Sequence, residues 1–279
     1  MNTEFIKNGK EITTKQNGED YTLEAGRVYN LKYKPFQGPI LEMDGILSLP
    51  DKIYTTMDED AFVNRIIKYF NERCTNNLGV LLTGLKGSGK TLMSKQLAVK
   101  ANLPIIVVDP GFRARDLNDF FLKFNQPVVV LFDEIEKNDY CWDTNDLLPF
   151  LDGVQKSGKR LVIMTCNNDS KLSDCIKNRC GRIRYKRNFE GVSDNMIKSI
   201  VYDFIENTDE YKDKLANYII ENISVRSFDN IISFCNDIIA ENYPEDFNEV
   251  IKYMNIDTKY LWIYLFLTTR ILPELVILT

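Results

Sequence analysis

The chain has 279 residues, of which 44% are apolar and 27% charged, and its formal net charge is −5. This composition is that of a globular protein, and the negative charge gives no general reason to expect nucleic-acid binding, although it leaves room for a local basic patch. The six cysteines form no CxxC pair and histidine is absent, which argues against zinc sites and excludes nucleophile–histidine catalysis.

The first 50 residues differ from the rest of the chain. Residues 1–20 are polar and lack the apolar stretch of an export signal, so we expect a cytoplasmic location. Residues 21–33 alternate roughly between apolar and polar positions around Gly26, which is typical of a β-hairpin. Pro35, Gly38 and Pro39 then punctuate short segments. We therefore predict a small β-rich N-terminal unit over residues 1–50.

The pattern changes from residue 51 onward. Apolar residues at Phe62, Ile66, Ile67 and Phe70 have the spacing of an amphipathic helix. Short apolar runs follow between helical stretches, and they lie at residues 79–83, 104–109, 128–133 and 160–165. Continuous apolar strands that alternate with helices favour a parallel sheet buried on both faces. We predict an α/β domain, a parallel sheet with flanking helices, over residues 51–190.

The remaining chain divides into a helical segment and an apolar tail. Residues 191–255 show only helical patterns, with Ser193 as an N-cap, and predict a small all-α domain. The tail, residues 256–279, is interrupted by Arg270 and Pro273, whereas a membrane span needs about 20 apolar residues. We expect no membrane span and a tail that packs on the protein or on a partner. Membrane contact, and a truncation or altered reading frame, are the alternatives.

Residues 84–91 match the phosphate-loop pattern G-x-x-x-x-G-K-[ST] at every fixed position. The motif also follows a predicted strand and precedes a predicted helix, which is the context that this loop requires. Glycines let the backbone N–H groups surround phosphate, Lys90 reaches the β- and γ-phosphates, and the Thr91 hydroxyl binds Mg²⁺. The predicted nucleotide-binding residues of the loop are Gly84, Leu85, Lys86, Gly87, Ser88, Gly89, Lys90, Thr91 and Leu92.

The apolar run at residues 128–132 ends in Asp133 and Glu134. When a complete phosphate loop precedes such a strand in the sequence, the acid at the strand's carboxyl end is predicted to lie beside Mg²⁺. Asp133 and Thr91 are therefore the predicted metal ligands. Glu134 is predicted to polarise the attacking water. Glu136 and Lys137 are interpreted as a surface pair or as residues that orient their neighbours.

At this point the chain resembles the AAA+ branch of the P-loop ATPases over residues 53–189. The resemblance is carried by the sequence LDG at residues 151–153, VIMTCN at 162–167 and NRCGRI at 178–183. It implies that Asn167 is a sensor residue that holds water against the γ-phosphate. It also implies that Arg179 and Arg182 are arginine fingers donated to a neighbouring subunit. The helical segment resembles the lid of this family, in which Arg226 would be the second sensor.

Two features are not absorbed by this resemblance. Arg184, Lys186 and Arg187 form a basic stretch that is either a solvated face or a phosphate-contacting patch. Family members that thread protein usually carry an aromatic loop after the second strand, and here this loop is reduced to residues 110–112, with Phe112 as its only aromatic residue. We therefore expect an ATPase that remodels or gates a partner without processive threading.

The sequence thus predicts Mg²⁺-dependent ATP hydrolysis at the subunit interfaces of a homo-oligomeric ring, with a hexamer as the expected size. Its cofactors would be ATP and Mg²⁺, and it would act on a protein client that the sequence does not identify. One alternative is an ATP-operated loader or scaffold with slow turnover in a replication or assembly complex. A P-loop small-molecule kinase is a further alternative, but the acid pair, Asn167 and the paired arginines argue against it.

Overall fold

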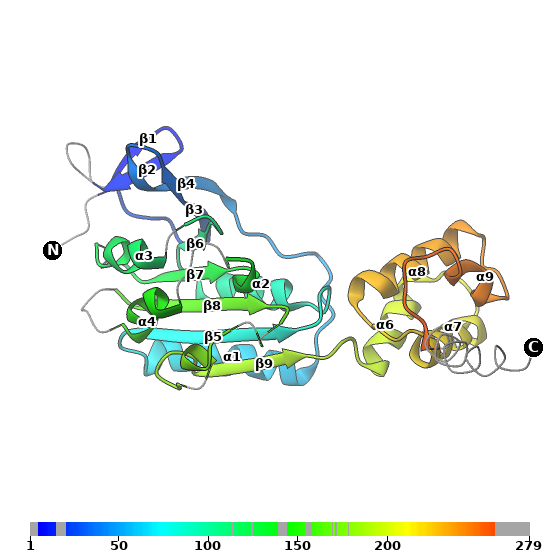
Figure 1. Cartoon of the computed structure of the whole chain (residues 1–279). Helices are drawn as coiled ribbons and strands as arrows, with labels where there is room; N and C mark the ends of the chain where they lie inside the picture. Colours follow the sequence, from blue (N-terminus) through cyan, green and yellow to red (C-terminus); the bar gives the residue numbers. More distant parts are fainter. Residues whose placement is uncertain are drawn as a thin grey trace, which may run out of the picture. The chain divides into compact units, whose positions relative to one another are not determined.

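A computed structural model describes residues 5–14, 21–112, 114–123, 125–138, 144–153, 158–168, 170, 172–177 and 179–259 (Figure 1). These residues belong to two compact units. The first unit combines Met1–Gly84 with Gly89–Phe189, and the second combines Leu85–Ser88 with Glu190–Thr279. The predicted tail from residue 260 onward lies outside the described residues. Among those described, no helix has the length and apolar character needed to cross a membrane.

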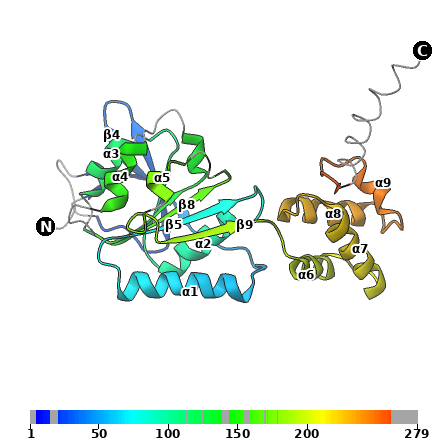
Figure 2. The same ribbon diagram turned by 60° about the horizontal axis from the view of Figure 1, so that its bottom comes forward.

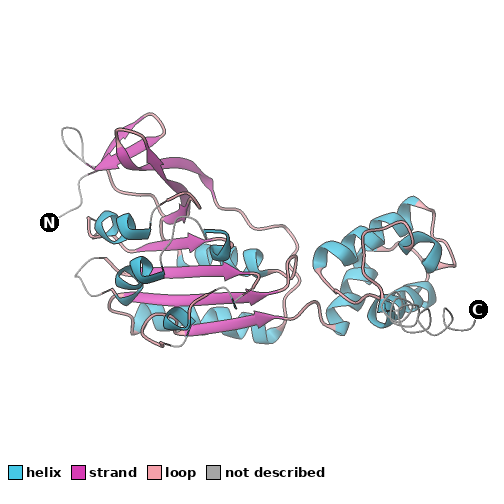
Figure 3. Ribbon diagram, viewed as in Figure 1, coloured by secondary structure: helices cyan, strands magenta, loops and turns pink. Residues whose placement is uncertain are grey.

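The first unit is built on a nine-stranded sheet with the order β1-β2-β4-β3-β6-β7-β8-β5-β9 (Figure 3). Its parallel part contains β3 (Arg27–Lys34), β6 (Ile105–Val108), β7 (Val128–Phe132), β8 (Arg160–Cys166), β5 (Asn77–Gly84) and β9 (Tyr185–Phe189). Every residue of β7 and β8 is buried, as their continuous apolar runs predicted. The predicted parallel α/β sheet is confirmed.

Helices cover both faces of this sheet, as Figure 2 shows. One face packs against α1 (Met57–Glu72) and α2 (Lys90–Ala101), through side chains such as Ile66, Phe70 and Leu97. The other face packs against α3 (Ala114–Phe121), α4 (Thr144–Asp152) and α5 (Asp174–Lys177), through side chains such as Phe121 and Phe150. A short 3-10 helix, η1 (Ile135–Asn138), follows β7. The parallel strands therefore all end at one edge of a sheet that is buried on both sides.

Helix α1 shows how local sequence sets an element's start. Thr56 is its N-cap, and the Thr56 hydroxyl accepts a hydrogen bond from the Glu59 N–H at 3.2 Å. The Glu59 carboxylate accepts a hydrogen bond from the Thr56 N–H at 2.8 Å in return. This capping box satisfies two backbone donors that would otherwise lack partners. The helix then buries Val63, Ile66, Ile67 and Phe70 against the sheet, close to the predicted pattern.

The N-terminal segment does not form a separate unit, contrary to the prediction from sequence. Strand β3 pairs in parallel with β6, from Val28 beside Ile105 to Leu31 beside Val108, and β4 (Gly38–Ile46) pairs antiparallel with β3. Strands β1 (Phe5–Asn8) and β2 (Glu11–Thr14) continue this antiparallel edge. Tyr29 and Leu31 are fully buried in the common core. The alternating pattern revealed strands, but it contained no information about which distant strand they would join.

The second unit is helical, with α6 (Asp194–Phe204), α7 (Asp209–Asn222), α8 (Phe228–Ala240) and α9 (Phe247–Ile251). Ser193 occupies the N-cap position of α6, as the sequence predicted, and the Thr208 and Ser227 hydroxyls accept backbone hydrogen bonds at the starts of α7 and α8. Ile200, Ile219 and Phe234 are fully buried in its core. Within this unit the Gly87 carbonyl also accepts the Phe228 N–H at 2.8 Å.

Candidate active site

The phosphate loop begins where β5 ends and leads into α2. Gly84, the last residue of β5, has a φ of +125°, and a Cβ atom there would lie 2.1 Å from the Phe189 carbonyl oxygen. Only glycine fits that backbone conformation and that close approach. Gly87 and Gly89 also have positive φ angles, of +71° and +98°. The loop therefore uses its glycines where the backbone turns most sharply.

Helix α2 starts at Lys90, and its N-cap residue Gly89 offers no side-chain hydrogen bond to the first backbone N–H groups. Unsatisfied N–H groups and the helix dipole make such a terminus an anion-binding site. The Lys90 ammonium donates to the Gly84 carbonyl oxygen at 2.8 Å, and its residue is only 5% exposed. Burial lowers the pKa of Lys90, while Glu136 and the Asp133–Glu134 pair oppose this change. A bound phosphate would supply the negative charge that this buried ammonium favours.

Asp133 follows β7 directly and faces Thr91 of α2. The Thr91 hydroxyl donates to Asp133 Oδ1 at 3.4 Å, and both residues are exposed, so their oxygens are accessible to a ligand. A cavity of about 160 Å³ lies beside them and is otherwise lined mainly by apolar side chains, including Val107, Leu131 and Ile163. A hydroxyl and a carboxylate are hard oxygen ligands that suit Mg²⁺, which usually takes one or two carboxylates together with nucleotide phosphates. The two residues therefore fit the predicted metal.

Thr165, near the end of β8, is a site residue that the sequence analysis missed. Its hydroxyl donates to Asp133 Oδ1 at 2.6 Å and accepts the Glu134 N–H at 2.8 Å, and the residue is 2% exposed. Phe132 of β7 pairs with Met164 of β8, so the residues that follow them, Asp133 and Thr165, lie side by side at the edge of the sheet. The available signal was a hydroxyl side chain near the end of an otherwise apolar run. Thr165 holds the two acids in a fixed position.

Glu134 and Asn167 meet at this edge of the sheet. The Asn167 amide donates from Nδ2 to Glu134 Oε1 at 2.8 Å. The other carboxylate oxygen of Glu134 is paired with Lys137. Glu134 has a φ of +49°, which is unusual for a residue with a side chain. Its hydrogen bonds to Thr165 and Asn167 hold this conformation, and such backbone strain often occurs at functional sites.

Glu136 is buried beneath Asn167 rather than placed on the surface. Its residue is 7% exposed, and Glu136 Oε1 accepts the Asn167 N–H at 2.8 Å. This contact agrees with the view that Glu136 orients a neighbour, and it excludes a surface pair with Lys137. Lys137 instead pairs with Glu134. The acids at positions 133, 134 and 136 thus have three different environments within four residues.

The two arginines predicted as fingers differ in the structure. Arg182 is buried, and its guanidinium makes two hydrogen bonds to the Asp152 carboxylate, at 2.8 and 2.9 Å, and a third to the Cys175 carbonyl. Arg179 has 65% of its side chain exposed and lies 3.7 Å from Asp152. Arg182 is therefore held inside its own domain, and this placement does not fit the expectation that it projects into a neighbour. Arg179 has the exposure that such a role requires.

The remaining predicted residues are placed as follows. Leu85 and Lys86 are exposed, Ser88 is buried and donates to the Leu85 carbonyl at 2.6 Å, and Leu92 is half-buried on α2. Arg226, in the second unit, forms an ion pair with Asp194. Phe112, the only aromatic residue of the shortened loop after β6, is fully buried, and its ring packs against Phe120 at 6.4 Å between centroids. Phe112 is therefore a core residue and not an exposed loop aromatic.

Comparison with known proteins finds similarity to one family of ATPases. Residues 80–189 match the model of the ATPase family associated with various cellular activities, AAA. The ATP-dependent zinc metalloprotease FtsH of Lactococcus lactis is 29% identical over 148 residues, which cover 45% of this chain and 21% of that protein. A protein of Methanocaldococcus jannaschii described as a 26S proteasome regulatory subunit homolog is 23% identical over 218 residues, 63% of this chain and 57% of that one. The chain therefore spans less than two thirds of either relative.

A mutant of Thermotoga maritima RuvB is similar in structure. The TM-score is 0.53 at 14% sequence identity, and the match covers 72% of this chain and 70% of that one. At this identity the likeness concerns the fold alone. It agrees with the α/β sheet and flanking helices described above.

Proposed function

We propose that this chain, which carries an AAA-family P-loop ATPase domain over residues 80–189, hydrolyses ATP with Mg²⁺ and couples hydrolysis to the remodelling of a macromolecular partner. The observation that carries the proposal is the hydrogen-bonded series from Thr91 through Asp133 and Thr165 to Glu134 and Asn167. It joins a metal-ligand pair to a carboxylate–amide pair at the end of the phosphate loop. A nucleotide-binding protein without hydrolysis would need only the first part of this series.

The first task of the site is to bind the triphosphate. The backbone of residues 84–89 and the uncapped start of α2 would surround the phosphate oxygens, and Lys90 would contact the β- and γ-phosphates. Thr91 and Asp133 would hold Mg²⁺. When bound, Mg²⁺ would supply the positive charge that neutralises the negative charge developing on the phosphate oxygens. Lys90 is buried and already carries an ordered hydrogen bond to Gly84, so little rearrangement is required of it.

The second task is to activate and orient water. Glu134 has one oxygen on the Asn167 amide and the other on Lys137, and its own N–H is fixed by Thr165. A carboxylate held in this way can accept a proton from a water molecule placed between it and the γ-phosphate. Asn167 would hold the same water from the side of β8. Glu136 is a positioning residue here because it accepts the Asn167 backbone N–H.

The third element is a cation supplied by a neighbouring copy. We propose that Arg179 contacts the γ-phosphate of the adjacent subunit in a homo-oligomeric ring, for which a hexamer is the expected size. Its 65% exposed side chain is compatible with this role, whereas Arg182 is held by Asp152. An arginine finger supplied in trans is worth about 10³–10⁵ in rate. We also propose Arg226 as a second sensor. This proposal rests on the resemblance to the AAA+ family, in which the second-sensor arginine lies near the start of a helix.

The client is proposed to be a protein that is remodelled or gated without processive threading. The short loop after β6 supports this view, because its aromatic residue Phe112 is fully buried and cannot grip a substrate from the loop surface. A threading reaction that is abolished by Phe112→Tyr, with the fold and ATP turnover unchanged, would contradict this part of the proposal.

The test is ATP turnover measured against protein concentration, with sizing in the presence of ATP, for wild type and Glu134→Gln. Glu206→Gln is the matched control, because Glu206 is an exposed carboxylate in the second unit. We expect turnover per chain to rise with concentration, Glu134→Gln to lower it by about 10²–10⁴, and Glu206→Gln to leave it unchanged. Full turnover by a dilute monomer would remove the role of Arg179. Tight ATP binding with almost no turnover under all conditions would instead favour a nucleotide-operated switch.

A further inference from the structure

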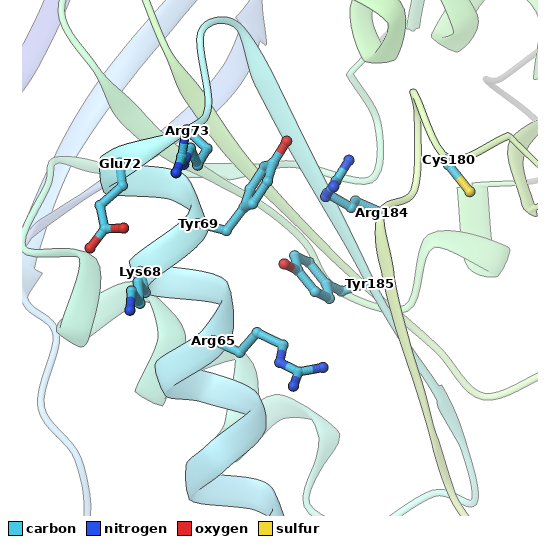
Figure 4. A pocket seen from close by; sticks show the side chains of 8 residues that line it. All are labelled: Arg65, Lys68, Tyr69, Glu72, Arg73, Cys180, Arg184 and Tyr185. Carbon is cyan, nitrogen blue, oxygen red and sulfur yellow. The ribbon is translucent and has the colours of Figure 1, made fainter.

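A second site lies between α1 and the edge strand β9, within the first unit. It is a groove of about 830 Å³, and its walls are formed by residues of α1 and by the segment that leads into β9 (Figure 4). We call it the α1–β9 groove. Its lining includes Arg65, Lys68, Tyr69, Arg73, Arg184 and Tyr185. The groove shares no lining residue with the nucleotide site described above.

The groove has an excess of positive charge. Arg65, Lys68, Arg73 and Arg184 are all exposed, and in the described part of the chain none of these four cations has a carboxylate within ion-pair distance. Among the described residues, Glu72 is the only acid that lines the groove, and no ion pair joins it to any of these four cations. In a protein with a net charge of −5, four such cations around one groove produce a local field of opposite sign.

The arginines next to the groove in sequence differ from Arg184 in having acidic partners. Arg182 is bound to Asp152, and Arg187 of β9 contacts both Asp58, at 2.6 Å, and Glu59, at 3.7 Å. Arg184 lies between them in sequence, yet its guanidinium stacks over the Tyr69 ring at 4.0 Å from the centroid. Acids therefore neutralise Arg182 and Arg187, which lie outside the groove, whereas Arg184 inside the groove has no acidic partner among the described residues.

The shape of the groove suits a linear anion. Arg65 and Tyr69 lie four residues apart on α1, and Arg73, the C-cap residue of α1, follows four residues later, so the three form one stripe that runs to the end of the helix. Figure 4 shows Arg65 and Tyr69 projecting toward Tyr185 and Arg184. With a rise of 1.5 Å per residue, the two arginines of this stripe are separated by about 12 Å along the helix. Arg184 provides a third guanidinium on the opposite wall. Each guanidinium can bind a phosphate through two parallel hydrogen bonds.

The aromatic residues distinguish between possible anions. The Tyr69 and Tyr185 rings are half-buried, lie 6.2 Å apart between centroids, and are oriented edge to face. An acidic peptide needs cations but has no specific use for two tyrosines at the base of its groove. Single-stranded nucleic acid uses both, because cations follow its backbone while aromatic rings and arginine planes stack on its bases.

We propose that the α1–β9 groove binds single-stranded nucleic acid, with Arg65, Arg73 and Arg184 on successive phosphates and Tyr69 and Tyr185 beside the bases. This binding does not rest on ATP hydrolysis. It assigns a ligand to Arg184 and removes Arg187 from the basic patch that the sequence indicated, since Arg187 is already paired with acids.

The test is fluorescence anisotropy of labelled oligothymidylate and oligouridylate of about 20 nucleotides, longer than the roughly 4–16 nucleotides of a typical single-strand site. The full chain is titrated without ATP at several salt concentrations. Three phosphate contacts predict a slope of log K against log[salt] of about −2. In Arg65→Gln/Arg73→Gln the slope should fall to about −0.7, and affinity at about 0.1 M salt should fall roughly 25-fold. Arg65→Lys/Arg73→Lys should keep most of the slope because the charges remain.

The control is Lys10→Gln/Lys123→Gln, which removes two exposed charges of the same unit outside the groove. Its affinity should equal that of wild type, and all variants should show the same thermal unfolding, because the substituted side chains are exposed. Equal binding by the groove and control variants would overturn the proposal, as would failure of wild type to bind either oligonucleotide. Binding of a polyglutamate peptide that depends on Arg65 and Arg73, without oligonucleotide binding, would assign the groove to an acidic protein instead. None of these results depends on whether ATP is hydrolysed.

Discussion

Charged groups at the carboxyl edge of the sheet and in the α1–β9 groove have opposite surroundings. At the sheet edge, Asp133, Glu134 and Glu136 each accept at least one hydrogen bond from another part of the fold, and Thr165 and Asn167 connect them. In the groove, Arg65 and Arg73 are exposed and have no acidic partner among the described residues. The first region is arranged before any ligand arrives, whereas the second offers charge to a ligand that has yet to bind.

This difference predicts which measured property should fall when a residue of each region is substituted. Groups that hold one another in fixed positions contribute to catalysis or to the free energy of unfolding, because their removal leaves a buried partner unsatisfied. Exposed cations without partners contribute little to the folded state, and their removal should be felt only by a ligand. Three substitutions at partnered positions test this distinction beyond the experiments above.

The largest effect is expected for Asn167→Ala. This change removes the Nδ2 donor from Glu134 while the Glu136 contact to the backbone of residue 167 can persist. We expect kcat to fall about 100-fold or more, because the water-activating carboxylate loses its orientation. ATP affinity, measured by titration of a fluorescent analogue, should change little. Asn195→Ala, at an exposed position on α6, is the control. Unchanged kcat in Asn167→Ala would show that the sheet edge does not act as a unit.

An intermediate effect is expected for Arg182→Ala. Asp152 has 21% of its side chain exposed, and it would lose both hydrogen bonds from Arg182. We expect the free energy of unfolding to fall by about 2 kcal/mol, which is below the range for a fully buried pair because Asp152 keeps some contact with water. Arg179→Ala is the matched control, since Arg179 is mostly exposed, and it should change stability by less than about 0.5 kcal/mol. Chemical denaturation of both variants measures the difference, and equal stabilities would contradict it.

The smallest effect concerns pH and the same ion pair. The hydrogen bonds from Arg182 lower the pKa of Asp152 below its ordinary value of 3.8. Because the pKa is lower in the folded than in the unfolded state, the pair stabilises the fold above pH 3.8 and this contribution is lost as the pH falls through the folded-state pKa. Asp152→Asn should therefore be less stable than wild type by about 1 kcal/mol at neutral pH. The two stabilities should converge as the pH falls from 3.8 through the lower folded-state pKa of Asp152, and a difference that persists when Asp152 is protonated in the folded state would contradict the assignment.

Much of the candidate site was predictable because its chemistry is local in sequence. The phosphate loop needs glycines, Lys90 and Thr91 at fixed spacing, and Asp133 and Glu134 follow an apolar strand directly. Asn167 was placed by resemblance, and its contact with Glu134 follows because parallel strands end at one edge of the sheet. Thr165 was missed, since a single hydroxyl in an apolar run does not indicate which neighbour it will bond.

The less predictable parts depend on residues that are far apart in sequence. Strand β9 was interpreted only as a basic stretch, because the roles of Tyr185 and Arg187 depend on Phe62, Tyr69 and the acids at the start of α1, which are far away in sequence. The same is true of Arg182, whose partner Asp152 is 30 positions away. A pattern of charges gives no information about which of them meet.

The sequence by itself thus determined the α/β core, the phosphate loop and the acids that follow β7, because periodicity and short-range spacing dictate strands, helices and the turn between them. Only the tertiary structure decided that β3 joins the parallel sheet, that Arg182 is internal while Arg179 is exposed, and that four cations border one groove. These outcomes depend on pairing between distant segments, in which strand register and burial select partners that no local pattern specifies.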